Sequence, residues 1–120
     1  MRGQSNPGIK RQRHGRLMLR PALLVLMQTG SAHGYEMLER LKVFGFNNID
    51  PSLIYRALRN MEEEGLVVST WDKKETQGPP RRVYSLTSEG SQALKIYIDD
   101  LKTSRDRIEQ LIKAYEQSTL

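Results

Sequence analysis

Polar side chains recur along one side of residues 51–64. At about 100° per residue, a helix over this range carries Ser52, Tyr55, Arg56, Arg59 and Glu63 on one face, with Asn60 at its margin. The opposite face is apolar and consists of Leu53, Ile54, Ala57, Leu58 and Met61. Guanidinium, hydroxyl and amide groups in this arrangement can donate hydrogen bonds to phosphate oxygens and to base edges in a DNA groove. Taken alone, such a face is more often a solvated surface.

A second polar group is basic and consists of Lys73, Lys74, Arg81 and Arg82, which surround the sequence Gly78-Pro79-Pro80. Glycine and proline break strand pairing, so this sequence predicts the tip of an antiparallel hairpin. Residues 1–20 carry six basic and no acidic groups, and residues 72–82 carry four basic and two acidic groups. Positive charge concentrated on an N-terminal arm and a hairpin tip suits a polyanionic partner. By charge alone, a solubilising tail with a solvated turn is an equally good interpretation.

The sequence offers little for catalysis or metal binding. It contains no cysteine, and its two histidines, His14 and His33, are expected to be ordinary loop or surface residues. No phosphate-binding glycine loop is present, and no pair of carboxylates converges on a site. We therefore expect neither an enzyme, nor a metal site, nor a cofactor. The longest apolar run, residues 22–27, is far shorter than the about 20 residues of a membrane span, so we expect a cytoplasmic protein without membrane contact.

The pattern of elements predicts a mainly α (α+β) fold, a winged helix-turn-helix domain followed by a long C-terminal dimerisation helix. Residues 1–15 are rich in glycine and polar groups and predict a flexible basic N-terminal arm. Pro21 is tolerated only near a first helical turn, so the first regular helix is expected to begin near Arg20 and to end before Gly30. Residues 31–34 predict a turn. The other expected elements are helices at 35–44 and 51–64, strands at 66–71 and 83–86, and a last helix from Thr87 or Ser88 to about Gln117. Together they predict a DNA-binding domain at 16–87 and a dimerisation helix at 88–120.

The helix over 51–64 has clear end signals. Asp50 is a suitable N-cap and Pro51 suits the first helical position, while Gly65 ends the helix. Residues 62–64 are three consecutive glutamates at the C-terminus, where the helix dipole disfavours negative charge and a DNA backbone would repel it. We therefore expect the N-terminal half of this helix to lie deepest in a groove and the acidic end to point away.

The last helix carries an apolar stripe near heptad spacing, formed by Leu94, Tyr97, Ile98, Leu101, Ile108, Leu111, Ile112 and Tyr115. At 1.5 Å per residue the stripe is about 40 Å long, which exceeds the small domain before it. Part of it would be exposed on a monomer, so we predict a homodimer whose two groove-binding helices lie about 34 Å, or one DNA turn, apart. The alternative is a helix that folds back on its own domain.

Four segments, in order, resemble the PadR family of bacterial and archaeal transcriptional regulators: GYEML at 34–38, SLIYRALRNMEEEGLV at 52–67, STW at 69–71 and GPPRRVYSLTSEG at 78–90. With Leu94, the resemblance covers about residues 17–95. It implies a winged-helix domain that binds double-stranded DNA, dimerisation through a C-terminal helix, and repression of a nearby operon. It also implies a small aromatic effector, because many members respond to phenolic or drug-like compounds, some of them held between the two protomers.

The resemblance also implies roles for single residues. Tyr35 matches the tyrosine of the family's second helix, and the recognition helix is matched by Ser52, Tyr55, Arg56 and Arg59. The outer wing strand is matched by Arg81, Arg82 and Tyr84, and the wing turn by Gly78 and Pro79. The chain departs from the family pattern in its longer basic arm, and its single short C-terminal helix is that of the family's short members.

The leading hypothesis is a dimeric repressor that binds a pseudo-palindromic operator. The alternative is a winged-helix module for DNA architecture or protein contacts, similar to replication-termination proteins of related shape, without promoter-specific regulation. The residues predicted to bind DNA are Tyr35, Ser52, Tyr55, Arg56, Arg59, Asn60, Lys73, Lys74, Arg81 and Arg82, and the residues predicted to form the dimer interface are those of the apolar stripe.

Overall fold

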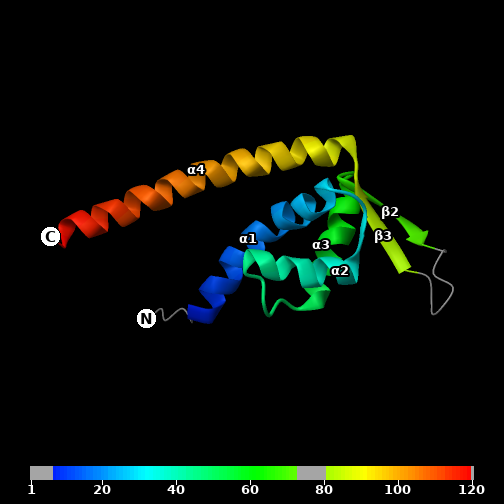
Figure 1. The fold of residues 1–120 in the computed structure, drawn as a ribbon, viewed down its shortest axis with the longest axis horizontal. Helices are drawn as coiled ribbons and strands as arrows, with labels where there is room; N and C mark the ends of the chain where they lie inside the picture. The colour runs from blue at the N-terminus through cyan, green and yellow to red at the C-terminus, as the bar shows by residue number, and fades with distance from the viewer. Residues whose placement is uncertain (1–6, 73–80, 120) are drawn as a thin grey trace.

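Three helices pack beside a small antiparallel sheet, and a fourth extends beyond it (Figure 1). The computed structural model describes residues 7–72 and 81–119, with side chains from residue 18 onward. The elements are α1 (Pro7–Gln28), β1 (Ala32–His33), α2 (Gly34–Arg40), the 3-10 helix η1 (Leu41–Phe44), α3 (Pro51–Glu63), β2 (Val67–Asp72), β3 (Arg81–Leu86) and α4 (Ser88–Ser118). This order and the mainly helical content confirm the predicted winged-helix class.

The helix α3 begins and ends where its sequence signals predict. Asp50 Oδ1 accepts the backbone N–H of Ser52 at 3.0 Å, and this hydrogen bond holds the pKa of the Asp50 carboxyl below its ordinary value. At the other end, Gly65 has a φ of 82°, the left-handed conformation that glycine adopts without strain. The apolar face is anchored in the core by Ile54, Leu58 and Met61, which are buried. The polar face is consequently held outward.

A single core joins all these elements. Its fully buried side chains are Leu23, Leu24, Met37, Leu41, Ile54, Leu58, Met61 and Val67. Tyr84 of β3 and Leu94 of α4 complete it. Burial raises the pKa of the Tyr84 phenol above its ordinary value, since a charged phenolate would lose its hydration there. The core therefore fixes α3, the sheet and the start of α4 relative to one another.

Residues 32–33 form a strand where we predicted a turn. The strand β1 pairs antiparallel with β3, with Ala32 opposite Tyr84 and His33 opposite Val83, so the sheet has the order β1-β3-β2. Two residues are too few to show the alternation that identifies a strand, and the pairing partner lies far along the chain. The correction matters for the site, because β1 brings His33 next to the wing strands.

The first helix is longer than predicted. It begins at Pro7 and not near Arg20, so residues 7–15 of the predicted arm lie within it. Proline suits the first turn of a helix at position 7, and the lysine, arginine and glutamine that follow are good helix formers. Pro21 consequently lies inside the helix, where it removes one backbone donor without ending it. Residues 1–6 lie outside the described part of the chain.

The last helix, α4, packs on the domain with its first turns and is exposed beyond them. Thr87 caps it, since its Oγ1 accepts the backbone N–H of Gly90 at 2.9 Å. Leu94 is buried in the domain's own core, and Tyr97 and Ile98 pack against that core. This placement corrects the prediction that Leu94 belongs to a dimer interface, because the first turns of α4 lie on α1. Residues 102–119 are exposed.

Candidate nucleic-acid interface

The outward face of α3 carries five residues predicted to bind DNA, which are all exposed: Ser52, Tyr55, Arg56, Arg59 and Asn60. They project from a helix whose opposite side is fixed in the core. The N-terminus of α3 is already capped by the Asp50 carboxylate, so the donors that this face offers to an anion are its side chains. This face can therefore present donors to a polyanion without rearrangement of the backbone.

A hollow of about 610 Å³ opens beside this face. Its lining consists of Gly34, Tyr35, Tyr55, Arg81, Arg82 and Tyr84. These residues come from α2, α3 and β3, so the fold gathers four predicted DNA-binding side chains, two tyrosines and two arginines, around one concave surface. Guanidinium and phenol groups together can donate several hydrogen bonds to phosphate oxygens.

Gly34 is a residue of this surface that the sequence pattern does not identify. The Tyr55 ring lies against its backbone, so closely that an added Cβ would be 2.5 Å from Cε1 of Tyr55. The three atoms nearest to that position all belong to the Tyr55 ring. Only glycine at position 34 therefore allows Tyr55 its observed place on α3.

Tyr35 and Arg81 form a stacked pair at the edge of the hollow. The guanidinium carbon of Arg81 lies 4.7 Å from the centroid of the Tyr35 ring, a cation–π distance. Tyr35 also contacts the imidazole of His33, and the centroids of the two rings are 5.2 Å apart. Tyr35 thus supports a wing arginine, a role that the sequence does not indicate.

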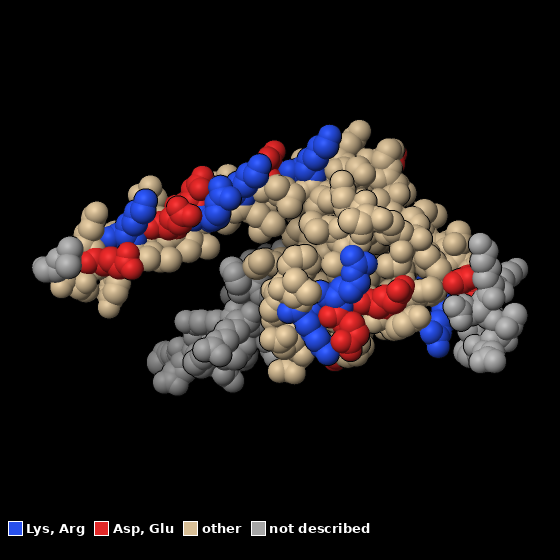
Figure 2. Space-filling view, in the orientation of Figure 1, with Lys and Arg blue, Asp and Glu red and all other residues tan. Residues whose placement is uncertain are grey.

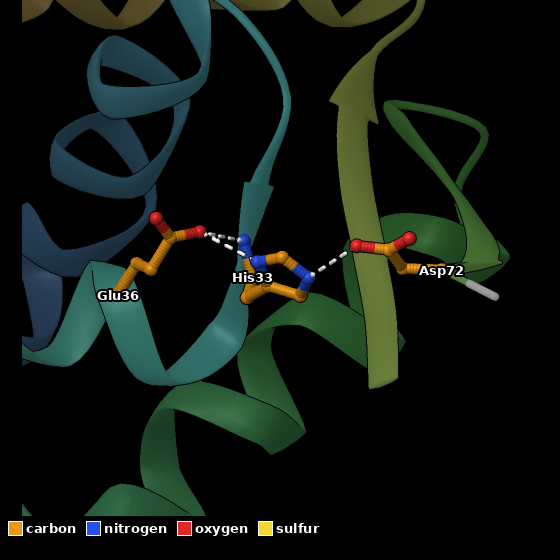
Figure 3. A network of polar contacts seen from close by, with 3 residues as sticks. All are labelled: His33, Glu36 and Asp72. Atoms are coloured by element: carbon orange, nitrogen blue, oxygen red, sulfur yellow. Dashed lines mark hydrogen bonds and ion pairs between the residues drawn. The ribbon is translucent and has the colours of Figure 1, made fainter. Parts of the chain in front are cut away.

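His33 connects α2 with the end of β2, as Figure 3 shows. Its Nδ1 lies 2.7 Å from a carboxylate oxygen of Glu36, and its Nε2 lies 3.2 Å from one of Asp72. Its backbone N–H donates to the same Glu36 oxygen at 2.8 Å, which is the main reason that the pKa of Glu36 is lowered. We expected an ordinary loop or surface residue, whereas the imidazole connects α2 with the end of β2 that precedes the wing turn.

Arg82 is held by a second set of contacts. Its Nη1 donates to Oγ of Ser69 at 2.6 Å, and its guanidinium carbon lies 4.7 Å from the centroid of a ring of Trp71. The Ser69 hydroxyl and backbone N–H both donate to Oε2 of Glu62, at 2.8 and 3.2 Å. These contacts join the C-terminal end of α3 to both wing strands.

Glu64, at the acidic end of α3, forms an ion pair within the domain. Glu64 receives two hydrogen bonds from the guanidinium of Arg20, at 2.6 and 2.8 Å, which lower the pKa of the carboxyl and raise that of the guanidinium. The same guanidinium lies 3.5 Å from the Tyr97 hydroxyl of α4. Arg20 is consequently engaged in the fold, although the charge count assigned it to the basic N-terminal group.

Several predicted positions lie outside the described residues, namely Lys73, Lys74 and the turn Gly78-Pro79-Pro80. Within the ranges that are described, no cluster of three histidine, cysteine or acidic side chains could hold a metal ion. No helix in the same ranges is long and apolar enough to cross a membrane.

Solved structures that are similar to this chain include several transcription regulators. A putative transcriptional regulator from Thermoplasma acidophilum has a TM-score of 0.72 at 26% identity, covering 84% of this chain and 96% of that one. A PadR family transcriptional regulator from Eggerthella lenta has a TM-score of 0.72 at 26% identity, and the match covers 87% of this chain and 88% of that one. A PadR-like transcriptional regulator from Bacillus cereus has a TM-score of 0.69 at 25% identity, and the match covers 79% of this chain and 91% of that one. A comparison with curated proteins finds no match. The sequence matches the Transcriptional regulator PadR-like family over residues 23–96, more than half of the chain, and the protein is therefore a member of that family.

Proposed function

We propose that the protein is a homodimeric repressor that binds a pseudo-palindromic operator through α3 and through the wing formed by β2, β3 and their connection. The observation that carries the proposal is the convergence of Tyr55, from the donor face of α3, and the two arginines of β3 on one hollow. Membership of a regulator family supports it.

In this proposal α3 is the recognition helix. Arg56 and Arg59 are long enough to reach base edges in a major groove, where a bidentate arginine distinguishes guanine. Ser52 and Tyr55 lie toward the N-terminal half of the helix and donate to a phosphate through their hydroxyl groups. Asn60 lies at the margin of the face and completes it. At the acidic end of α3, Glu64 accepts from Arg20 and Glu62 accepts from Ser69. These two carboxylates therefore do not compete with DNA for the donors of the recognition helix.

The wing contributes contacts to the backbone beside the recognition helix. Arg81 and Arg82 line the same hollow as Tyr55, so one phosphate group can face both elements. Lys73 and Lys74 belong to the same proposed contact, and their charge adds to the salt-dependent part of the affinity. Tyr35 acts there mainly by supporting Arg81.

The exposed part of α4 forms the proposed dimer interface. Large apolar side chains are unusually exposed there. Their exposed fractions are 72% for Leu111, 70% for Tyr115, 51% for Ile112 and 46% for Ile108. Leu101, half-buried, continues the same stripe toward the domain. Figure 2 shows charged side chains of both signs along the edge of α4 that is turned away from the domain, and uncharged ones along the other edge. A second copy of α4 would cover the apolar edge and leave the charged edge in water.

DNA binding is tested by fluorescence anisotropy with a labelled duplex from the region upstream of the protein's own gene. We expect at least about a thousandfold preference for this duplex over random DNA, since specific binders typically achieve that ratio. The titration is repeated over a range of salt concentrations, because phosphate contacts alone would give affinity without preference. Equal affinity for both duplexes would refute the operator-specific repressor and favour the architectural module.

Dimerisation is tested by sedimentation of the double variant Ile108→Glu, Ile112→Glu. We expect a monomer, because two charges would have to be buried in the apolar interface. Both positions are exposed in the single chain, so the variant is expected to fold. Lys113→Glu, at an exposed position that lies outside the apolar stripe by helical spacing, is the matched control and should remain dimeric. A dimeric mass for the double variant would place the interface elsewhere.

We extend the proposal to a small aromatic effector on the strength of the family resemblance. A set of phenolic compounds is added to the protein–operator complex in the anisotropy assay. Release of the operator by one compound, with a matching rise in the melting temperature of the free protein, supports an effector. An operator complex that none of the compounds changes would restrict the protein to repression without this class of ligand.

A further inference from the structure

We propose that Ser69 and Glu62 are positioning residues for DNA binding, which act by holding the Arg82 guanidinium in place before DNA arrives. The inference rests on the DNA-binding function proposed above and deepens it. Neither Ser69 nor Glu62 needs to touch the nucleic acid in this arrangement. Their effect on affinity passes through Arg82.

The hydrogen bonds around Ser69 run in one direction. The Arg82 Nη1 donates to Ser69 Oγ at 2.6 Å, so the hydroxyl acts as an acceptor toward the arginine. Its single proton is then directed to Glu62 Oε2, 2.8 Å away, and the Ser69 backbone N–H supports the same carboxylate oxygen at 3.2 Å. The negative charge of Glu62 therefore reinforces the bond that Ser69 accepts from Arg82.

Trp71 restrains the other side of the arginine. The indole lies directly opposite Arg82 in the β2–β3 register, and the guanidinium carbon is 4.7 Å from the centroid of one of its rings. Arg82 is exposed in spite of these contacts. An arginine has five N–H donors, so most of them stay available for a phosphate while the side chain is held.

Holding the arginine in advance has a calculable benefit. Immobilising a flexible side chain upon binding costs affinity, and a side chain that is already held has lost that freedom beforehand. By the usual size of this cost, we expect loss of the Ser69 hydroxyl to weaken operator binding about 2- to 10-fold. The same chain of contacts also fixes the wing relative to α3, because Glu62 belongs to α3, Ser69 to β2 and Arg82 to β3.

The first test is a double-mutant cycle measured by operator binding. Ser69→Ala and Glu62→Ala should each weaken binding in the wild-type background and have no further effect when combined with Arg82→Ala. Ser69→Thr keeps the hydroxyl and should retain the affinity. Thr70→Ala, at an exposed position of the same strand, is the matched control and should leave the affinity unchanged. An equal loss in both Arg82 backgrounds, or failure of threonine to restore binding, would overturn the proposal.

The second test needs no DNA. Trp71 is the only tryptophan in the sequence, so its fluorescence reports directly on the Arg82 contact. Arg82→Ala should expose the indole and increase its quenching by acrylamide, and Ser69→Ala should shift the quenching in the same direction. Unchanged quenching in Ser69→Ala would overturn the positioning role. If quenching shifts as expected but the wild-type protein shows no operator preference, the function proposed above is the part that fails.

Discussion

The substitution Gly34→Ala should separate stability from DNA binding. An alanine Cβ would lie 2.5 Å from Cε1 of Tyr55, well inside the van der Waals limit, so the tyrosine ring must move. The ring can move toward solvent, because Tyr55 is 43% exposed. The three atoms nearest to the added Cβ all belong to that ring, so the ring is the group that gives way. Alanine is also favoured over glycine in a helix by up to about 1 kcal/mol. We therefore expect the free energy of unfolding to change by less than about 1 kcal/mol.

The loss in affinity can be estimated from the group that is displaced. A hydrogen bond from a hydroxyl to a charged phosphate is worth about 1.5–3 kcal/mol, and moving the Tyr55 hydroxyl would forfeit the phosphate contact proposed for it. At 1.4 kcal/mol per factor of ten, operator binding should weaken about 10- to 150-fold. The measurement is an anisotropy titration with the operator, paired with urea unfolding of the same protein.

Tyr55→Phe is the matched variant for this prediction. It removes the hydroxyl but leaves the ring against Gly34, so its loss in affinity should be similar. Combined, the two substitutions should weaken binding hardly more than either alone, because both remove the same hydrogen bond. The reasoning is refuted if Gly34→Ala binds the operator normally while Tyr55→Phe does not. It is equally refuted if Gly34→Ala unfolds the domain.

Three further outcomes are expected. Arg56→Ala should cost about 1–3 kcal/mol and relax the preference for one base pair if the arginine reads a base, and a uniform loss across all sequences would assign it to phosphate. The ion pair between Arg20 and Glu64 should stabilise the fold above the ordinary carboxyl pKa of 4.5, and this contribution should disappear as the pH falls through the lowered pKa of Glu64. Urea unfolding of wild type and Glu64→Gln should accordingly differ by at most about 1 kcal/mol at pH 7 and converge in acid, since the carboxylate is half exposed. Gly90→Ala should lower the melting temperature, because the added methyl group would collide with the backbone carbonyl of Leu66 and cost about 1–3 kcal/mol.

The helix α3 could be predicted because its signals are local. Asp50 caps it, Gly65 ends it, and the apolar residues between them repeat at helical spacing, so no distant partner is needed to identify the element. The strand β1 has no such signal. It exists because Ala32 and His33 pair with β3, which lies far along the chain, and pairing of that kind leaves no pattern in two residues.

The two apolar surfaces of α4 could not be separated for a related reason. Periodicity shows that Leu94 and Leu111 lie on one stripe, but it does not show which part of the stripe the helix's own domain will cover. The covered part is set by the position of α1 against the first turns of α4. Sequence reasoning therefore assigned Leu94 to an interface, whereas it belongs to the core.

The contacts around the candidate site were the least predictable, because each joins residues from different elements. Glu62 appeared in the sequence as part of an unfavourable acidic end, a charge that must point away from DNA. In the fold its carboxylate is the acceptor that orients Ser69. The effect of a charge on binding depends on its partners in space, and these follow only from the tertiary structure.

The attachment of α4 to the domain bears on how a dimer would read DNA. Thr87 N–H donates to the Leu66 carbonyl at 3.1 Å, next to the turn that ends α3, and Gly90 allows the first turn of α4 to lie against the same carbonyl. Arg20 adds a link from Glu64 to Tyr97 of α4. Because α3 and α4 are joined at this point, a rotation of one α4 against its partner would move the attached recognition helix with it. In the proposed dimer, the spacing of the two operator half-sites is therefore set by the packing of α4, and a ligand that shifted this packing would alter operator affinity without touching the DNA-binding surface.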